Sequence, residues 1–222
     1  MSPSIQRTFT MRMVSAETYA AAGARALIVE SFRARLKAYP NTNHKRFLVV
    51  ETLVYGLPTI AACSSITFAH TQKLFSEKYF PDRLEERISR EFDVECSRNS
   101  ICEIGSLSTD PLLIPSVKSV VAYFPWFATR LGCKFSLVTV TSYMRIALER
   151  AGASFEPFCN ADPSVLQPEE RIRWGKYYDF DPQTGIIDLK RLDFLNEIVT
   201  PSARPNEVMI QLGCFGKVEA CS

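Results

Sequence analysis

Apolar and polar positions alternate along the chain with two different periods. Residues 6–14 (QRTFTMRMV) alternate polar and apolar side chains, which predicts a half-exposed first β-strand. The next apolar residues recur every four positions, at Ala24, Ile28, Phe32 and Leu36. This spacing predicts a helix with Ser15 as its N-cap that ends near Pro40.

The middle of the chain continues with further strand-like and helix-like runs. Residues 46–69 hold two or three apolar runs separated by turn residues, which predicts a meander of adjacent strands. The later segments are predicted to be helices within 71–93, a strand over 101–107, a helix from Asp110 to Leu131, a central strand over 134–141, a helix over 142–152 and a strand over 154–158.

This order of elements predicts an α/β protein. We expect a single mixed, mostly central-parallel sheet with helices on both faces. No repeat or linker divides the chain, so residues 1–222 are expected to form one domain with a core over about 6–160. Residues 161–222 are expected to form a C-terminal extension with one further candidate strand, NEVMIQLG (206–213).

Composition excludes several functional classes. The 26 basic and 24 acidic residues leave a formal charge of +2, so no broad field favours DNA binding. The window from Thr52 to Ala69 is uncharged but broken by turn residues, so no transmembrane span is expected. No pair of cysteines has CxxC spacing, and His44 and His70 lie far apart in the sequence, so no local metal site is expected.

Cysteine usage and the N-terminus bear on the compartment. The seven cysteines are an odd number and several lie in apolar runs, which favours reduced thiols. The first residues lack the uninterrupted apolar stretch of a secretory signal. A cytoplasmic location is therefore expected.

Three stretches of the chain resemble one known family. These stretches are KLFSEKYFPDRLEERISREFDVECSRNSICEIGSLS, VTVTSYMRIALERAG and WGKYYDFDPQTGIIDL. Between Leu74 and Leu189 the sequence is similar to the thermostable hemolysin family. The core of that family usually reads like E-V-G-N-L-A, whereas this chain has EIGSLS, with Ser106 at the position where Asn is common.

The resemblance implies an acetyltransferase-like fold, similar also to that of acyl-homoserine-lactone synthases. In such folds two neighbouring parallel strands separate, and the gap admits a pantetheine arm. ICEIGSL and KFSLVTVT would be these two strands. The acetyltransferase loop that binds pyrophosphate is rich in glycine, whereas this chain has STDPLLIPS, in which the Asp110 carboxylate would repel phosphates. A carrier protein is therefore favoured over free coenzyme A as the source of the thioester.

Glu103 is the leading candidate for catalysis. Strand alternation places it on the face shared by Ile101, Gly105 and Leu107, where partial desolvation would raise the pKa of its carboxyl and suit it to act as a general base. The alternative is a structural carboxylate that accepts backbone hydrogen bonds or pairs with an arginine. Cys102 points to the opposite face, so a nucleophilic thiol is not favoured.

Other polar positions are candidates for substrate binding. The strand at Ile104 and Gly105 is expected to hold the pantetheine amides, and Ser106 either donates to the thioester oxygen or caps the following turn. The remaining candidates are residues at the end of the second strand and in the RWGKYYDF tract, namely Thr139, Thr141, Arg145, Trp174, Tyr177 and Tyr178. Arg145 either binds an anion or forms a surface salt bridge, and the aromatic tract either borders the acceptor or is a structural lid.

These observations favour an enzyme that transfers an acyl group from a thioester to a small-molecule amine. The donor would be an acyl-carrier protein or acyl-coenzyme A, with no tightly bound cofactor. One alternative takes the family name literally and predicts a membrane-damaging protein, which would need an insertion element or an apolar surface patch. The other is a non-catalytic binding module with the same fold.

Overall fold

The computed structural model describes residues 8–204, 206–210 and 212. Within these residues the strands form one nine-stranded sheet in the order β6-β7-β5-β4-β3-β2-β1-β9-β8. The strands are β1 (Phe9–Ser15), β2 (Arg46–Val54), β3 (Leu57–Phe68), β4 (Ile101–Thr109), β5 (Phe135–Val140), β6 (Phe155–Asn160), β7 (Gln183–Asp188), β8 (Thr200–Pro201) and β9 (Glu207–Ile210).

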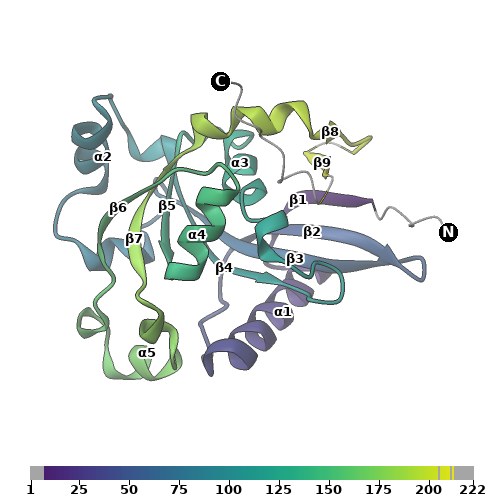
Figure 1. Ribbon diagram of the computed structural model, residues 1–222, viewed down its shortest axis with the longest axis horizontal. Helices are drawn as coiled ribbons and strands as arrows, with labels where there is room; N and C mark the ends of the chain where they lie inside the picture. The colour runs from purple at the N-terminus through teal and green to yellow at the C-terminus, as the bar shows by residue number, and fades with distance from the viewer. Residues whose placement is uncertain (1–7, 205, 211, 213–222) are drawn as a thin grey trace.

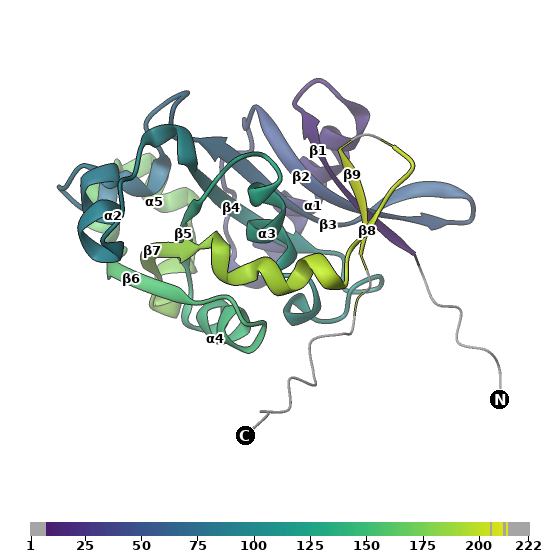
Figure 2. The ribbon, with the colours of Figure 1, turned by 90° about the horizontal axis from the view of Figure 1, so that it is seen from above.

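Helices cover both faces of the sheet, as predicted (Figures 1 and 2). The α-helices are α1 (Tyr19–Leu36), α2 (Leu84–Phe92), α3 (Tyr123–Thr129), α4 (Ser142–Arg150) and α5 (Pro168–Arg173). The 3-10 segments are η1 (Phe75–Tyr79), η2 (Arg98–Ser100), η3 (Val117–Ser119), η4 (Pro163–Val165), η5 (Tyr177–Phe180) and η6 (Leu189–Glu197). Helices α1 and α2 pack on one face, and α3, α4 and η6 pack on the other.

Parallel pairing is confined to one central pair of strands. Strands β4 and β5 are parallel, and all the other neighbouring pairs in the described sheet are antiparallel. The sheet is therefore mixed, as expected, but less parallel than the sequence analysis predicts. The reason is topological: β4 and β5 are joined through a helical crossover, whereas β1 to β4 meet antiparallel partners.

The C-terminal part of the chain belongs to the sheet. Strand β7 lies between β5 and β6, and β8 and β9 extend the opposite edge beyond β1. The described residues after 160 thus contribute strands β7, β8 and β9 to the same sheet as the residues before them. The predicted strand over 206–213 is present as β9, although Gln211 and Gly213 lie outside the described residues.

Two helix boundaries differ from the sequence prediction. Helix α1 is capped by Thr18 rather than Ser15, because the Thr18 hydroxyl accepts a hydrogen bond from the Ala21 amide (3.2 Å). The helix expected from Asp110 to Leu131 is reduced to η3 and α3. Pro115 explains the difference, because proline has no amide hydrogen and disfavours a helical conformation in the residue before it.

The largest hydrophobic cluster fills the space between the sheet and α3. Trp126, Tyr123, Phe124 and Phe127 are almost fully buried there, and the Trp126 indole donates to Asn196 Oδ1 (3.1 Å). Among the described residues, no helix has the length and apolar character needed to span a bilayer. The uncharged window from Thr52 to Ala69 forms the end of β2 and the whole of β3.

Gly185 in β7 allows a close approach of β6. A Cβ atom at this position would overlap the backbone oxygen of Glu156 and lie 2.7 Å from the Phe155 ring. We therefore expect Gly185→Ala to lower the free energy of unfolding by about 1–3 kcal/mol or more, as overpacking does. Urea denaturation would measure this loss.

Gly23→Ala in α1 is the matched control for this substitution. Its Cβ would lie 3.2 Å from Ile60 Cγ1, a side-chain atom that can move. Alanine is also favoured over glycine in a helix by about 1 kcal/mol, so little net loss is expected. Equal destabilisation by the two substitutions would contradict the close approach of β6 and β7.

Candidate active site

Strands β4 and β5 separate soon after they begin. Their parallel pairing extends only from Ile101–Phe135 to Glu103–Leu137, although β4 runs on to Thr109 and β5 to Val140. Beyond Glu103 the edge of β4 that faces β5 has no partner among the described strands. The structure therefore contains the separated strands that the sequence resemblance implied.

A β-bulge in β4 accompanies the separation. Ser65 pairs with Gly105 and Cys63 pairs with Ser108, so that two residues of β4 lie opposite Ser64 alone. One of these two, Ser106, has a φ of 55°, in the left-handed region. The bulge turns Leu107 to pack against the cluster of Cys102 and Ile104, so Leu107 does not share the face of Glu103 as alternation predicted.

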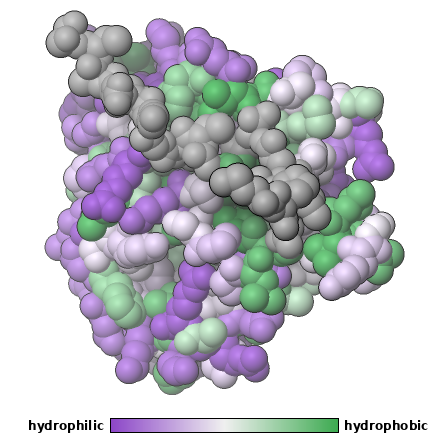
Figure 3. Space-filling view, turned by 45° about the vertical axis from the view of Figure 1, so that its right-hand side comes forward, coloured by the Kyte–Doolittle hydropathy of each residue, from purple (hydrophilic) through white to green (hydrophobic). Residues whose placement is uncertain are grey.

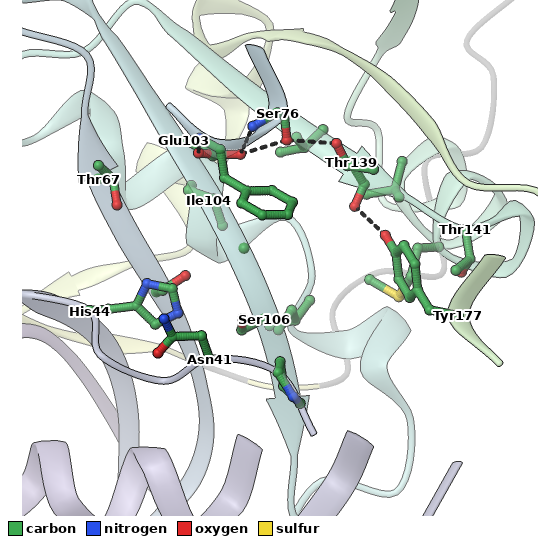
Figure 4. Close-up of a pocket in the computed structure, with 18 of the residues that line it drawn as sticks. Asn41, His44, Thr67, Ser76, Glu103, Ile104, Ser106, Thr139, Thr141 and Tyr177 are labelled. Atoms are coloured by element: carbon green, nitrogen blue, oxygen red, sulfur yellow. Dashed lines mark hydrogen bonds between the residues drawn. The ribbon is translucent and has the colours of Figure 1, made fainter. Parts of the chain in front are cut away.

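A cavity of about 390 Å³ occupies the gap between the separated strands (Figure 4). Phe32 and Trp174 line it from the face of the sheet that α1 covers. Met144 and Leu148 line it from the face that α3 and α4 cover. The cavity thus reaches both faces of the sheet through the gap.

Glu103 lies in this gap with its carboxylate held by η1. Oε2 accepts from the Phe75 amide (2.7 Å), and Oε1 accepts from the Ser76 amide (2.9 Å) and hydroxyl (2.5 Å). Burial raises the pKa of Glu103 above its ordinary value, although these hydrogen bonds act in the opposite direction. Since a carboxylate has about four lone-pair sites, one on Oε2 is left for another donor.

An ion-pair network keeps η1 in the position that serves Glu103. The Glu77 carboxylate accepts from the Leu74 amide (2.7 Å) and from Arg98 Nη2 (2.8 Å). Arg98 also contacts Glu85 of α2 (3.3 Å). This network anchors η1 so that the amides of Phe75 and Ser76 face Glu103.

A chain of hydroxyl groups leads away from Glu103 (Figure 4). The Ser76 hydroxyl is 2.6 Å from Thr139 Oγ1, which is 2.7 Å from Thr184 Oγ1. Each hydroxyl has a single hydrogen, and Ser76 donates its hydrogen to ionised Glu103. Thr139 must then donate to Ser76, and Thr184 must donate to Thr139.

Aromatic side chains form one wall of the cavity. Tyr177 and Trp174 lie with their ring centroids 4.9 Å apart, and the Tyr177 hydroxyl donates to the backbone oxygen of Thr139 (2.8 Å). Burial raises the pKa of Tyr177, so its hydroxyl stays protonated. The Tyr177 ring is therefore tied to β5, the strand that contributes Thr139 to the hydroxyl chain.

Most of the residues predicted from sequence meet at this cavity. Those that line it are Glu103, Ile104, Gly105, Ser106, Thr139, Thr141, Trp174 and Tyr177. Arg145 does not, because its guanidinium is paired with Asp181 Oδ2 (2.7 Å). Tyr178 does not line the cavity either. Its hydroxyl lies 2.6 Å from that of Tyr79, which does line it.

Sequence reasoning missed one group of cavity residues. His44 and its neighbours Asn41 and Asn43, from the loop between α1 and β2, line the cavity, as does Ser76 of η1. Arg173 of α5, the first residue of the RWGKYYDF tract singled out from the sequence, lines it too. The only signal in the sequence was the polar run NTNHK, which is typical of an exposed loop. These residues are distant in sequence from Glu103, so only the packing of α1 and η1 against the sheet brings them together.

In the loop after β4, backbone amides donate hydrogen bonds within the loop itself. The Asp110 carboxylate accepts from the Leu112 amide (2.8 Å), and the Asp110 backbone oxygen accepts from the Ile114 amide (2.8 Å). These amides are therefore not free to bind a pyrophosphate. Among the described residues no cluster of three His, Cys, Asp or Glu side chains could hold a metal ion.

Comparisons with known proteins agree with this geometry. The family model for thermostable hemolysin matches residues 14–192. The N-acyl amino acid synthase FeeM, from uncultured soil microbes, is 9% identical and has a TM-score of 0.56 over 86% of this chain and 95% of its own. The acyl-homoserine-lactone synthase LasI is 11% identical, with a TM-score of 0.52 over 89% of this chain and 98% of its own. No curated protein matches the sequence significantly.

The Ser76 hydroxyl is expected to control the ionisation of Glu103. Ser76→Ala removes a donor that stabilises the carboxylate, so the pKa of Glu103 rises further. A carboxyl whose pKa is higher in the folded than in the unfolded state stabilises the fold at a pH below its unfolded-state pKa. This stabilisation is lost as the pH rises through its folded-state pKa. The stability deficit of the variant should therefore grow with rising pH, as urea denaturation between about pH 4 and pH 8 would show.

Ser108→Ala is the control for this pH dependence. Ser108 is also buried in this region, but its hydroxyl donates to the backbone oxygen of Ser106 (3.2 Å) and has no hydrogen bond to a described carboxylate. The loss of stability in Ser108→Ala, relative to the wild-type protein, should stay constant with pH. The same constant deficit in Ser76→Ala would refute the coupling to Glu103.

Proposed function

This chain belongs to the thermostable hemolysin family, and we propose that it is an N-acyltransferase that transfers an acyl group from a thioester to an amine. The observation that carries the proposal is the position of Glu103, a carboxylate with a raised pKa in the gap between two separated strands. Such a group can take a proton at near-neutral pH. We therefore assign the role of general base to Glu103.

The free edge of β4 is suited to an extended donor arm. Ile104, Gly105 and Ser106 line the cavity beyond the last β4–β5 pair, where backbone groups lack a partner strand. A pantetheine arm carries two amides and can pair with such an edge as an added strand would. Its thioester would then lie near Ser106, whose hydroxyl can donate to the carbonyl oxygen.

The reaction follows from this arrangement. The amine nitrogen attacks the thioester carbonyl carbon, a C–N bond forms, and the C–S bond breaks. The amine proton passes to Glu103 Oε2, and the leaving thiolate ends as a thiol after taking up a proton. No covalent intermediate with the protein is required, in line with the position of the Cys102 thiol in the core on the other face.

The loop after β4 favours a donor that lacks the pyrophosphate group of coenzyme A. Its amides at Leu112 and Ile114 are bonded to Asp110, and the Asp110 carboxylate would repel phosphate groups. An acyl-carrier protein or a shorter pantetheine thioester therefore fits better than acyl-coenzyme A. The fold shared with FeeM and LasI supports acyl transfer as the class of reaction.

The organisation and location of the protein also enter the proposal. We propose that the chain works as one domain, because strands from both halves of the sequence build the same sheet around the cavity. The described cysteines, Cys63, Cys96, Cys102, Cys133 and Cys159, are free thiols. Free thiols support a reducing compartment such as the cytoplasm.

Glu103→Gln should abolish turnover and preserve the fold. Glutamine keeps the shape of the side chain but does not take up the amine proton, so kcat should fall by about 10²- to 10⁴-fold. Release of thiol from octanoyl-pantetheine, octanoyl-carrier protein and octanoyl-coenzyme A, in the presence of amines, would measure it. Thermal unfolding would confirm the fold.

Glu86→Gln is the matched control for loss of a carboxylate. Glu86 lies on α2, away from the cavity, where it pairs with Arg83 (2.9 Å). This variant should retain full activity. Full activity of Glu103→Gln would instead exclude Glu103 as the base.

Damage to membranes is a second candidate function, and one observation favours it. The hairpin that joins β2 and β3 carries exposed apolar side chains, Leu53, Tyr55 and Leu57. On the face shown in Figure 3, hydrophobic side chains (green) interrupt the hydrophilic surface in several places. Leucine and tyrosine side chains at a protruding tip are suited to the interface of a bilayer.

Dye release from liposomes would test this second candidate. If the hairpin inserts into bilayers, the purified protein should release the dye, and a variant with Leu53→Ser, Tyr55→Ser and Leu57→Ser should not. Under the acyltransferase proposal we expect no release from either protein at micromolar concentration, and equal acyl transfer by both.

A further inference from the structure

The two ends of the cavity differ in chemistry. The end covered by α3 and α4 is apolar, lined by Val121, Phe124, Pro125, Val138, Met144 and Leu148. The end covered by α1 and α5, called the polar end below, has the aromatic wall on one side and polar side chains on the other, from Asn41, Asn43, His44, Thr67, Gln72 and Arg173. Glu103 projects from the side of the sheet that bears the polar end, toward η1 (Figure 4). A molecule bound at the polar end therefore presents its polar groups near the proposed base.

One charged group at the polar end has no partner among the described residues. Of the residues that line the described cavity, Glu103, Glu170 and Arg173 bear full charges when ionised. Glu170 is neutralised by Lys78, whose Nζ lies 2.9 and 3.0 Å from its two oxygens. The guanidinium of Arg173 has no ion pair or hydrogen bond with any described residue. The four charges of Glu103, Glu170, Lys78 and Arg173 sum to zero, but Arg173 makes no direct contact with a described anionic group and is free to pair with one on a bound molecule.

The backbone at Arg173 is fixed against the end of α1. The Arg173 oxygen accepts from the Tyr39 amide (2.6 Å), and the Lys176 amide donates to the Leu36 oxygen (2.8 Å). Between these bonds Gly175 packs so closely on Lys37 that a Cβ would overlap its backbone. Arg173 is therefore carried by a braced segment, although its side chain is exposed.

His44 offers a hydrogen-bond acceptor at the same end. The backbone of Asn41 lies next to the ring, and Nε2 is buried and has no hydrogen-bond partner among the described residues. Burial lowers the pKa of His44, so the ring is neutral. In the tautomer that carries its proton on Nδ1, Nε2 is an acceptor, and an unpaired buried acceptor is costly unless a ligand satisfies it.

We propose that the polar end of the cavity binds an acceptor amine that also carries a carboxylate, as a free amino acid does, with Arg173 binding the carboxylate and His44 Nε2 accepting a hydrogen bond from the acceptor. The inference rests on the proposed acyltransferase function, because it assigns the acceptor of that reaction. An arginine fork matches the two oxygens of a carboxylate. It would repel a diamine, whose second ammonium group would meet the guanidinium.

A panel of paired acceptors tests the charge requirement. The wild-type protein would be supplied with octanoyl-pantetheine and with free amino acids, the matching amino-acid amides, or putrescine. An amide keeps the amine and the side chain but lacks the carboxylate. We expect kcat/KM for the acids to exceed that for the amides by at least about tenfold, which corresponds to one good charge-assisted contact.

Arg173→Gln and Arg171→Gln form the matched pair of variants. Arg171 also lies on α5 and is exposed, but it does not line the cavity, so its loss changes the net charge equally. Arg173→Gln should raise KM for the acids at least about tenfold and remove their advantage over the amides, with kcat little changed. Arg171→Gln should behave as the wild-type protein.

Substitutions of His44 separate hydrogen bonding from proton transfer. Glutamine can place an oxygen where Nε2 stands, whereas asparagine reproduces only the nitrogen nearer the backbone. We expect His44→Asn to raise KM for the acceptor about tenfold and His44→Gln to raise it less, both with kcat preserved. A large loss of kcat in both would overturn the assigned role, since His44 would then act as a proton-transfer group.

Binding of the same acceptors, measured by calorimetry without a donor, distinguishes the failure of this inference from that of the proposed function. Equal kcat/KM for acids and amides, or identical behaviour of Arg173→Gln and Arg171→Gln, overturns the inference and leaves acyl transfer standing. Arg173-dependent binding of amino acids without acylation by any donor supports the site and overturns the transferase. The absence of both binding and transfer overturns both.

Discussion

The early separation of β4 from β5 is the constraint on which the candidate site depends. Only three residues of each strand are paired with the other strand. After them, the facing edges of β4 and β5 are unpaired and border the cavity. The bulge at Ser106 shifts β4 relative to β3 at this level and turns the following side chains over. Without the separation no cavity would pass through the sheet, and Glu103 would be an ordinary buried carboxylate of a closed strand pair.

The surroundings of Glu103 balance two opposing effects. Burial makes the ionised form costly, and the amides and hydroxyl from η1 offset that cost. The offset depends on the position of η1, which Glu77 and Arg98 hold through a separate ion pair. The hydrogen bonds from η1 thus set the proton affinity of the proposed base, and the Glu77–Arg98 ion pair holds η1 in place. Preorganised sites require this kind of support.

The polar end of the cavity gives this base a defined neighbour. Arg173 and His44 come from segments more than a hundred residues apart, and the contact between the end of α1 and the Gly175 turn brings them to one opening. A carboxylate bound there orients the amine of the same molecule toward Glu103. Positioning of this kind lowers the barrier by removing the entropy cost of bringing the reacting groups together.

The sequence alone predicted the α/β class, the strands β4 and β5 and the face of Glu103, because period-two and period-four patterns report which faces are buried. The RWGKYYDF tract stood out by its aromatic and polar composition instead. The sequence misplaced Leu107, since a single bulge reverses alternation and leaves no mark in composition. It left Arg145 open between an anion site and a salt bridge, and only packing placed Asp181 beside it. Tertiary structure also placed Ser76, His44 and Arg173 at the cavity. Their proposed roles depend on contacts with residues distant in the chain, which local sequence patterns do not report.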